Sequence, residues 1–317
     1  MATSCLAHGD GGSGEVDSMH RPVLLQEVLA CLQPRSGGIY LDGTVGDGGH
    51  SQAILETSGP DGRLIGLDRD AAALAHAGPR LLPFGARAML IQSHFREADH
   101  IVAEKGIRGI HGAILDLGVS SRQLDTAARG FSFMSDGPLD MRMDTREPRT
   151  AADLVNSLPE SELARLLFKH GEERYARRIA RAIVRRRESG PILTTRALVD
   201  VIRRKVPPAY LYGRLHCATR TFQALRIAVN RELEDLGSTL QLLALLLLPG
   251  GRLIVISYHS LEDRIVKHTF RGLGQGARTG FDVLTKQPIK PSADECADNP
   301  RARSAKLRVL ARKEETL

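Results

Sequence analysis

The stretch Asp42-Gly-Thr-Val-Gly-Asp-Gly-Gly-His50 decides the fold predicted for this chain. It follows a short apolar run, Gly38-Ile-Tyr-Leu41, and precedes an amphipathic one, Ser51-Gln-Ala-Ile-Leu55, so the order predicts strand, tight turn and helix. Glycines let the backbone turn sharply and leave room for a ligand to lie against it. The N–H groups of the helix N-terminus then point at a carboxylate or phosphate. We therefore expect a binding site for a nucleotide-type cofactor.

Two cofactors compete for this turn. A dinucleotide fingerprint requires G-x-G-x-x-G, but the frame here is Gly46-Asp-Gly-Gly-His-Ser51, which lacks the third glycine. An acid at the end of the strand, Asp42, followed by G-x-G is typical of the first motif of class I methyltransferases. A second acid, Asp68, ends the next apolar run, where it can bind ribose hydroxyls. The turn favours S-adenosylmethionine and leaves a dinucleotide as the alternative.

Composition limits the class of protein. The 317 residues are 42% hydrophobic and 26% charged, as in a soluble globular protein with one large domain and a smaller one. The longest aliphatic run, 240–248, is too short to span a bilayer. Residues 1–19 contain no Lys or Arg and no apolar stretch, so we expect a disordered tail without a signal peptide. The four cysteines share no close spacing, which predicts no metal site and a cytoplasmic location.

The net charge of +7 is unevenly distributed. Seven arginines fall within residues 174–187, on a predicted helix whose apolar stripe contains Ile179 and Ile183. The density exceeds what solubility needs and predicts contacts with a phosphate backbone, with a solvated helix face as the alternative. The three arginines expected to bind RNA share the face opposite the stripe and are Arg177, Arg181 and Arg185.

The order of predicted elements indicates an α/β protein with a doubly wound parallel sheet. Strand-like runs at 38–42, 63–68, 88–92 and 110–116 alternate with helical patterns at 51–57, 71–82 and 97–105. Only loops and helices follow, at 151–156, 160–169, 173–188 and 194–205, before a helix at 229–248, a strand at 252–256 and an antiparallel pair at 280–284 and 305–311. We expect a Rossmann-like domain, 20–124 and 216–317, interrupted by a helical insertion at 125–215.

Longer motifs make the chain resemble the MraW/RsmH family, the ribosomal RNA small subunit methyltransferases that act on cytosine N4. The resemblance runs from residue 20 to residue 309. Besides the glycine turn it rests on Asp116-Leu-Gly-Val-Ser-Ser-Arg-Gln-Leu-Asp125, Gly130-Phe-Ser-Phe133, Gly137-Pro-Leu-Asp-Met-Arg-Met143, Thr219-Arg-Thr-Phe-Gln-Ala-Leu-Arg226, Tyr258-His-Ser-Leu-Glu-Asp-Arg264 and Asn299-Pro-Arg-Ala-Arg-Ser304.

The resemblance implies a bacterial, cytoplasmic class I methyltransferase that uses S-adenosylmethionine. Its implied substrate is a cytidine in the decoding region of 16S ribosomal RNA, as part of the small ribosomal subunit, and a homodimer stays open. The cofactor contacts that it implies are Gly48, Gly49, His50, Asp68, Phe95, Asp116 and Gln123. Main-chain groups of residues 48–50 suit the methionine end and Phe95 the adenine face, whereas Gln123 rests on the resemblance alone.

Catalytic residues are expected at two strand ends. Asp116 ends the fourth strand, where it can accept a hydrogen bond from the cytosine amine, although a purely cofactor-holding role is the alternative. No Pro-Pro-aromatic sequence follows it, so Tyr258 is expected to supply the aromatic ring, with His259 beside it, and to contact an extruded base. Ser260 to Asp263 has the pattern of a capping box for the following helix.

Two other function classes remain open from the residues. A dinucleotide-dependent oxidoreductase would explain the turn but neither the arginine helix nor the missing glycine. A non-catalytic RNA-binding protein would explain the arginines and leave the cofactor turn unused. The methyltransferase interpretation explains all of these features.

Overall fold

The computed structural model describes residues 22–213, 215–275 and 280–314, so the tail predicted at 1–19 lies outside the described residues. Its centre is a sheet in the order β3-β2-β1-β4-β5-β7-β6. The strands are β1 (Ile39–Asp42), β2 (Arg63–Asp68), β3 (Ala88–Gln92), β4 (Ile110–Asp116), β5 (Leu247–Ser257), β6 (Phe281–Val283) and β7 (Lys306–Arg312). The first five are parallel, and β7 lies antiparallel to both β5 and β6. The predicted parallel sheet and its antiparallel pair are confirmed.

Apolar side chains on both sides of the strands explain this sheet. In β4, Ala113 and Leu115 pack into one core and Ile114 into the other. A strand that is buried on both faces reads as a continuous apolar run. One face is covered by α1 (Leu25–Leu32), α2 (Gly49–Thr57) and α3 (Ala71–Leu81), and the opposite face by α4 (Ala98–Glu104), α12 (Leu236–Leu246) and α13 (Ser260–Gly274).

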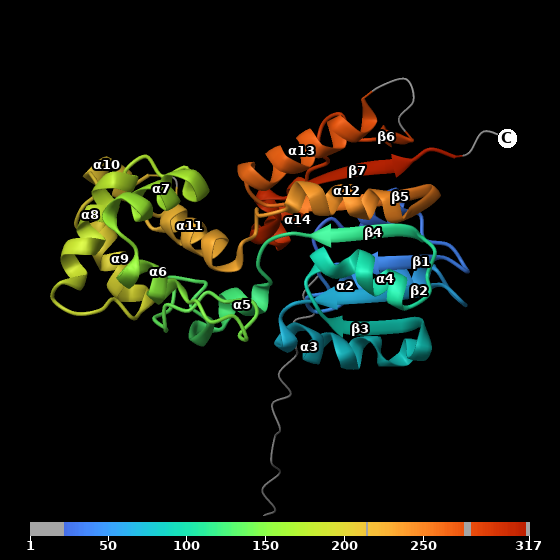
Figure 1. The fold of residues 1–317 in the computed structure, drawn as a ribbon, viewed down its shortest axis with the longest axis horizontal. Helices are drawn as coiled ribbons and strands as arrows, with labels where there is room; N and C mark the ends of the chain where they lie inside the picture. Colours follow the sequence, from blue (N-terminus) through green and yellow to red (C-terminus); the bar gives the residue numbers. More distant parts are fainter. Residues whose placement is uncertain (1–21, 214, 276–279, 315–317) are drawn as a thin grey trace, which may run out of the picture.

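A group of helices, which we call the helical lobe (residues 121–230), lies beside the carboxyl ends of the parallel strands (Figure 1). It contains α5 (Ser121–Asp125), α6 (Ala151–Ser157), α7 (Glu160–Gly171), α8 (Ala176–Arg187), α9 (Thr195–Arg203), α10 (Pro208–Leu211) and α11 (Thr219–Asn230). These helices share a hydrophobic core to which α11 contributes Phe222, Leu225 and Val229. We therefore propose that the inserted domain ends near Asn230, later than the predicted limit of 215.

The single helix predicted at 229–248 is wrong. Helix α11 ends at Asn230, Arg231 adopts a left-handed φ of 50°, and α12 begins only at Leu236. Residues 231–235 include Glu and Leu, which favour helices, so local propensity does not explain the break. Contacts from other segments do: the Asn230 amide donates to the Met141 carbonyl oxygen at 2.7 Å and accepts from the Met143 N–H at 2.7 Å.

Short elements complete the chain: the 3₁₀ turns Leu82–Arg87, Phe95–Glu97, Ala127–Arg129 and Pro300–Ser304, and α14 (Ala293–Asp298). Across the described ranges, no helix is both long and apolar enough to cross a membrane.

Candidate active site

A cavity of about 350 Å³ opens at the carboxyl ends of the parallel strands. The strand order reverses at this point. After β1 the chain continues to β2 and β3 on one side, whereas after β4 it continues to β5 on the other side. Such a switch point is where open α/β sheets bind ligands. The residues at or just past the strand ends that line it are Gly43, Asp68, Ser93, Asp116 and Tyr258.

The glycine turn forms one wall of the cavity. Gly46 and Gly48 have φ values of 52° and 80°, the left-handed region that glycine adopts without strain. Asp42 does not line the cavity: its carboxylate accepts from the Thr44 N–H at 3.0 Å and from the Ser51 hydroxyl at 2.6 Å. Burial raises the pKa of Asp42 to about 6. Asp42 therefore braces the turn, and no side chain in the described part of the chain caps α2, which leaves its first N–H groups for a ligand.

Of the predicted cofactor contacts, Gly48 alone lies outside the cavity wall, directly before Gly49, which lines it. The His50 Nε2 atom lies 3.0 Å from the Val23 carbonyl oxygen, which requires it to carry the proton as donor. Burial lowers the pKa of His50, so the ring is neutral and its Nδ1 faces Asp116 Oδ2 at 3.8 Å. The ring therefore anchors α2 to the Val23 segment.

Asp68 and Phe95 face the cavity from the ends of β2 and β3. The Asp68 carboxylate accepts from the N–H groups of Gly46 at 2.9 Å and Asp70 at 2.8 Å, and burial raises its pKa. Each of its oxygens has a second lone pair for a hydroxyl. The Phe95 ring packs against His94, with centroids 4.3 Å apart, and also against the core under the sheet. Phe95 thus combines core packing with a place in the wall.

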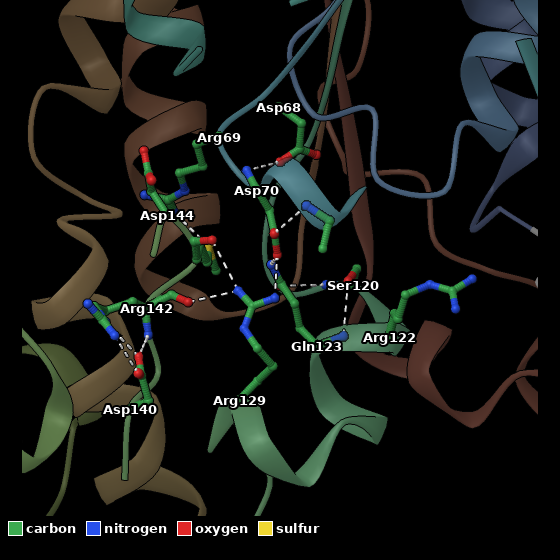
Figure 2. A network of polar contacts seen from close by, with 12 residues as sticks. Asp68, Arg69, Asp70, Ser120, Arg122, Gln123, Arg129, Asp140, Arg142 and Asp144 are labelled. Atoms are coloured by element: carbon green, nitrogen blue, oxygen red, sulfur yellow. Dashed lines mark hydrogen bonds and ion pairs between the residues drawn. The ribbon is translucent and has the colours of Figure 1, made fainter. Parts of the chain in front are cut away.

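Gln123 belongs to a polar network that joins the turn after β2 to the helical lobe (Figure 2). Its Nε2 donates to Asp70 Oδ2 at 2.8 Å, and Arg129 Nη1 reaches the same oxygen at 2.8 Å. Arg129 Nη2 also donates to the carbonyl oxygens of Arg142 at 2.9 Å and Met143 at 3.1 Å. Sequence reasoning missed Asp70 and Arg129, because their pairing depends on segments about sixty residues apart.

Asp116 and Tyr258 form a hydrogen-bonded pair in the wall of the cavity. The Tyr258 hydroxyl donates to Asp116 Oδ1 at 2.8 Å. Burial raises the pKa of Asp116 to about 7; the tyrosine hydrogen bond lowers it, and the Glu262 charge raises it. Burial, with the Asp116 charge, raises the pKa of Tyr258 well above its usual value, so the phenol keeps its proton. A carboxyl group poised near neutrality at a ligand site is a candidate for proton handling.

His259 is brought next to Tyr258 but does not line the cavity. It is the N-cap of α13: its Nδ1 accepts from the Glu262 N–H at 3.3 Å, and Glu262 accepts in return from the N–H groups of Tyr258 and His259. The capping box predicted at Ser260 and Asp263 is thus one residue too late. Histidine is an unusual N-cap, and Asp263 binds Arg308 Nε at 2.6 Å instead, a contact with β7 that local sequence cannot reveal.

Sequence reasoning also missed a charged end of the cavity. Arg226 of α11 and Glu232, in the link to α12, line it and form a two-pronged ion pair at 2.9 and 2.7 Å. Possible ligand atoms of Glu232, His259 and Glu262 lie within 4.8 Å of one another. The Arg226 cation already occupies the Glu232 carboxylate, and His259 Nδ1 accepts a backbone hydrogen bond, so we assign no metal there. The only sequence signal for Arg226 is the family motif at 219–226.

The predicted RNA-binding arginines lie apart from the cavity. Arg177, Arg181 and Arg185 are exposed on α8, at the outer edge of the helical lobe (Figure 1). Arg181 Nε lies 3.3 Å from Glu160 Oε1, and both side chains are exposed, whereas the other two make no hydrogen bond or ion pair with described residues. Arg187 has a structural role, since its Nη1 donates to the carbonyl oxygens of Val155 and Leu158.

The donor set fits S-adenosylmethionine better than a dinucleotide. The carboxylates of Asp47, Asp68 and Asp116 surround the glycine turn in the cavity wall. They would repel a pyrophosphate, whereas they suit ribose hydroxyls, an ammonium group and a sulfonium. The open N-terminus of α2 suits the one carboxylate of the methionine part.

The sequence model of the MraW methylase family matches residues 17–313. Three similar proteins carry the name ribosomal RNA small subunit methyltransferase H. The protein from Syntrophotalea carbinolica is 52% identical over 92% of this chain and 98% of its own length. That from Geobacter sulfurreducens is 54% identical over 92% and 97%, and that from Geotalea daltonii 53% over 93% and 98%.

Proposed function

Because this chain belongs to the MraW methylase family, we propose that it transfers a methyl group from S-adenosylmethionine to N4 of a cytidine in the decoding region of 16S ribosomal RNA. Relatives that share about half of its residues along nearly their whole length are named as small subunit rRNA methyltransferases. The observation that carries the chemistry is the half-buried Asp116 carboxyl, paired with Tyr258 beside the glycine turn.

When bound, S-adenosylmethionine supplies an electrophilic methyl group on a sulfonium. The chain holds it through the first N–H groups of α2 and through Asp68, whose free lone pairs accept from the ribose hydroxyls. Phe95 offers a ring to the adenine at the end of β3. Gln123 acts through Asp70 and keeps the turn after β2 in place.

The cytosine amine is a poor nucleophile because its lone pair is delocalised into the ring. The site must turn that lone pair toward the methyl group, so positioning supplies most of the rate. We propose that Asp116 accepts a hydrogen bond from the amine, rotates it out of conjugation and takes up its proton after transfer. Tyr258 holds the Asp116 carboxylate in orientation and presents its ring to the extruded base. Glu262 fixes the main chain of Tyr258, whereas His259 only caps α13.

The proposal is tested by incubating the purified protein and deuterium-labelled S-adenosylmethionine with small ribosomal subunits and, separately, with free rRNA. Mass mapping of the rRNA is expected to find labelled N4-methylcytidine at one decoding-region position. A titration with S-adenosylmethionine and NAD is expected to show binding of the first only. Label on another base or position would refute the proposed specificity, and binding of NAD alone would refute the methyltransferase.

Replacing Tyr258 by phenylalanine is expected to shift the pH dependence of methylation upward. The tyrosine hydroxyl stabilises the ionised Asp116, so its removal should raise the pKa of Asp116 above its value of about 7. The acidic limb of kcat/KM should therefore move to higher pH, which a pH–rate profile measures.

Replacing Tyr258 by alanine is expected to lower RNA affinity while S-adenosylmethionine affinity is kept. Equal losses of both affinities would mean that the Tyr258 ring only packs against its neighbours and does not contact the base.

Replacing Arg177, Arg181 and Arg185 together by alanine is expected to weaken RNA binding without affecting cofactor binding. For each phosphate that an arginine no longer neutralises, the slope of log affinity against log salt should flatten by about 0.7–0.9. All three side chains are exposed, so the fold should tolerate the change. The slope is measured by RNA titration at several salt concentrations.

Arg187→Ala is the contrasting variant, since it removes the hydrogen bonds to two carbonyl oxygens and should lower the stability of the fold. A triple variant that binds RNA normally at physiological salt would show that α8 is only a solvated surface.

A further inference from the structure

Arg226 presents an unpaired donor to the cavity. Its side chain is 15% exposed, and its Nε and Nη2 are held by Glu232, which is 6% exposed. Its third nitrogen, Nη1, makes no hydrogen bond or ion pair with any residue that the structure describes, although Arg226 lines the cavity. A guanidinium held by two of its nitrogens is rigid, so the remaining N–H groups point in a set direction.

Glu262 links this donor to the Asp116 acceptor. Possible ligand atoms of Glu262 and of Glu232, which holds Arg226, lie within 4.8 Å of each other. Tyr258, whose main chain Glu262 holds, donates to Asp116. The Glu262 carboxylate is 2% exposed and holds the main chain of Tyr258 at 2.9 Å. Its charge acts on Asp116, on Tyr258 and on Arg226, raising the pKa of each. The cavity thus offers a carboxylate acceptor and a guanidinium donor around one buried acid.

We propose that Arg226 reads the Watson–Crick edge of the target base by donating from Nη1 to N3 of cytosine, while Asp116 accepts from N4. The inference rests on the proposed function and adds how the site chooses its base. Cytosine carries a donor at N4 and an acceptor at N3, whereas uracil carries an acceptor at position 4 and a donor at N3. Uracil would therefore oppose acceptor to acceptor and donor to donor, and a site built for hydrogen bonds rejects such a mismatch strongly.

The test uses short RNA substrates with cytidine or 3-deazacytidine at the target position. In 3-deazacytidine a C–H group replaces N3 and removes the acceptor, while N4 remains. Dissociation constants are measured with S-adenosylhomocysteine bound, and kcat/KM is measured for the proteins that turn over. For the unaltered protein, 3-deazacytidine is expected to bind about 10–100-fold more weakly, the usual effect of losing a hydrogen bond to a charged group.

The protein variants are designed around the ion pair. Arg226→Met alone would leave Glu232 buried and unpaired, so Arg226→Met is combined with Glu232→Gln. The double variant should bind cytidine RNA more weakly and lose most of the discrimination against 3-deazacytidine. Glu232→Gln alone keeps the guanidinium and should still discriminate. The control is a matched ion pair away from the cavity wall, Arg142 and Asp140. The double variant Arg142→Met with Asp140→Asn should discriminate between the two RNAs as the unaltered protein does.

The outcomes separate the inference from the proposed function. The inference is wrong if the unaltered protein binds both RNAs equally, or if the double variant discriminates as strongly as the unaltered protein. Failure to methylate both the cytidine RNA and the small subunit would instead overturn the proposed function. Calorimetric titration with S-adenosylmethionine shows that each variant retains the folded cofactor site.

Discussion

Replacing Asp116 by asparagine is expected to lower the turnover of methyl transfer by roughly 10²–10⁴-fold, the usual worth of a positioned acid or base. Asparagine keeps the size of the side chain and can still accept the Tyr258 hydroxyl, but it cannot take up a proton from the cytosine amine. Single-turnover kinetics at saturating S-adenosylmethionine measure the effect. Asp116 would be only a cofactor ligand if product formed at the normal rate while cofactor affinity alone fell.

The pH dependence gives the same prediction an independent readout. The acceptor must be ionised, and the pKa of Asp116 lies at about 7, so kcat/KM should rise tenfold per pH unit up to about 7 and then level off. The two imidazoles that line the cavity, His50 and His94, do not account for this limb. Burial lowers the pKa of His50, and burial with the charges of Arg69 and Arg96 lowers that of His94 to about 3. Asp116→Asn should abolish the acidic limb in the residual activity.

The thermal stability of Asp116→Asn shows whether its loss of turnover is caused by unfolding. The pKa of Asp116 is raised on folding from about 4 to about 7, so the folded protein binds more protons than the unfolded chain in that window. The stability contributed by this group is therefore present at low pH and falls as the pH rises through the window. Asparagine carries no charge to bury, so Asp116→Asn should melt no lower than the unaltered protein at pH 8.

Replacing Arg129 by alanine is expected to lower the free energy of unfolding by about 3–5 kcal/mol, the usual cost of breaking a buried ion pair from one side. The Asp70 side chain is 6% exposed and would lose its counter-ion, and the carbonyl oxygens of Arg142 and Met143 would lose their donor (Figure 2). Urea unfolding measures the change. Because this network joins the end of β2 to the helical lobe, RNA methylation should fall as well.

Arg146 supplies the matched control for Arg129. It pairs with Asp144 at 2.7 Å, but its side chain is 62% exposed. Arg146→Ala should therefore cost less than about 1 kcal/mol. Arg129→Lys should be intermediate, since an ammonium cannot contact Asp70 and both carbonyl oxygens with the geometry of a guanidinium. If the losses for Arg129→Ala and Arg146→Ala were equal, the network of Figure 2 would not hold the lobe in place.

Much of the sheet could be predicted because its strands carry their signal locally. The run that ends at Asp68 is apolar since both faces of β2 are covered, and Asp70 begins α3 with a side-chain cap that residue type alone suggests. The break between α11 and α12 could not be predicted in this way. Asn230 ends α11 through contacts with Met141 and Met143, about ninety residues earlier in the chain.

The candidate site, like the fold, could be predicted only in part from local sequence. The local pattern of an acid, a glycine turn and a helix was enough to predict a cofactor class and the end of the sheet where the cavity lies, because backbone freedom and helix N-termini are properties of short segments. The expected strand ends, together with the family motifs, pointed to Asp116 and Tyr258. Which polar groups meet was decided by the tertiary structure alone. The Tyr258 hydroxyl reaches Asp116 across 142 residues, Arg129 reaches Asp70 from the helical lobe, and His259 turns away to cap α13. The physical reason is that pairing and burial, which shift the pKa of Asp116 and leave one nitrogen of Arg226 without a partner among the described residues, arise only when distant segments exclude water together.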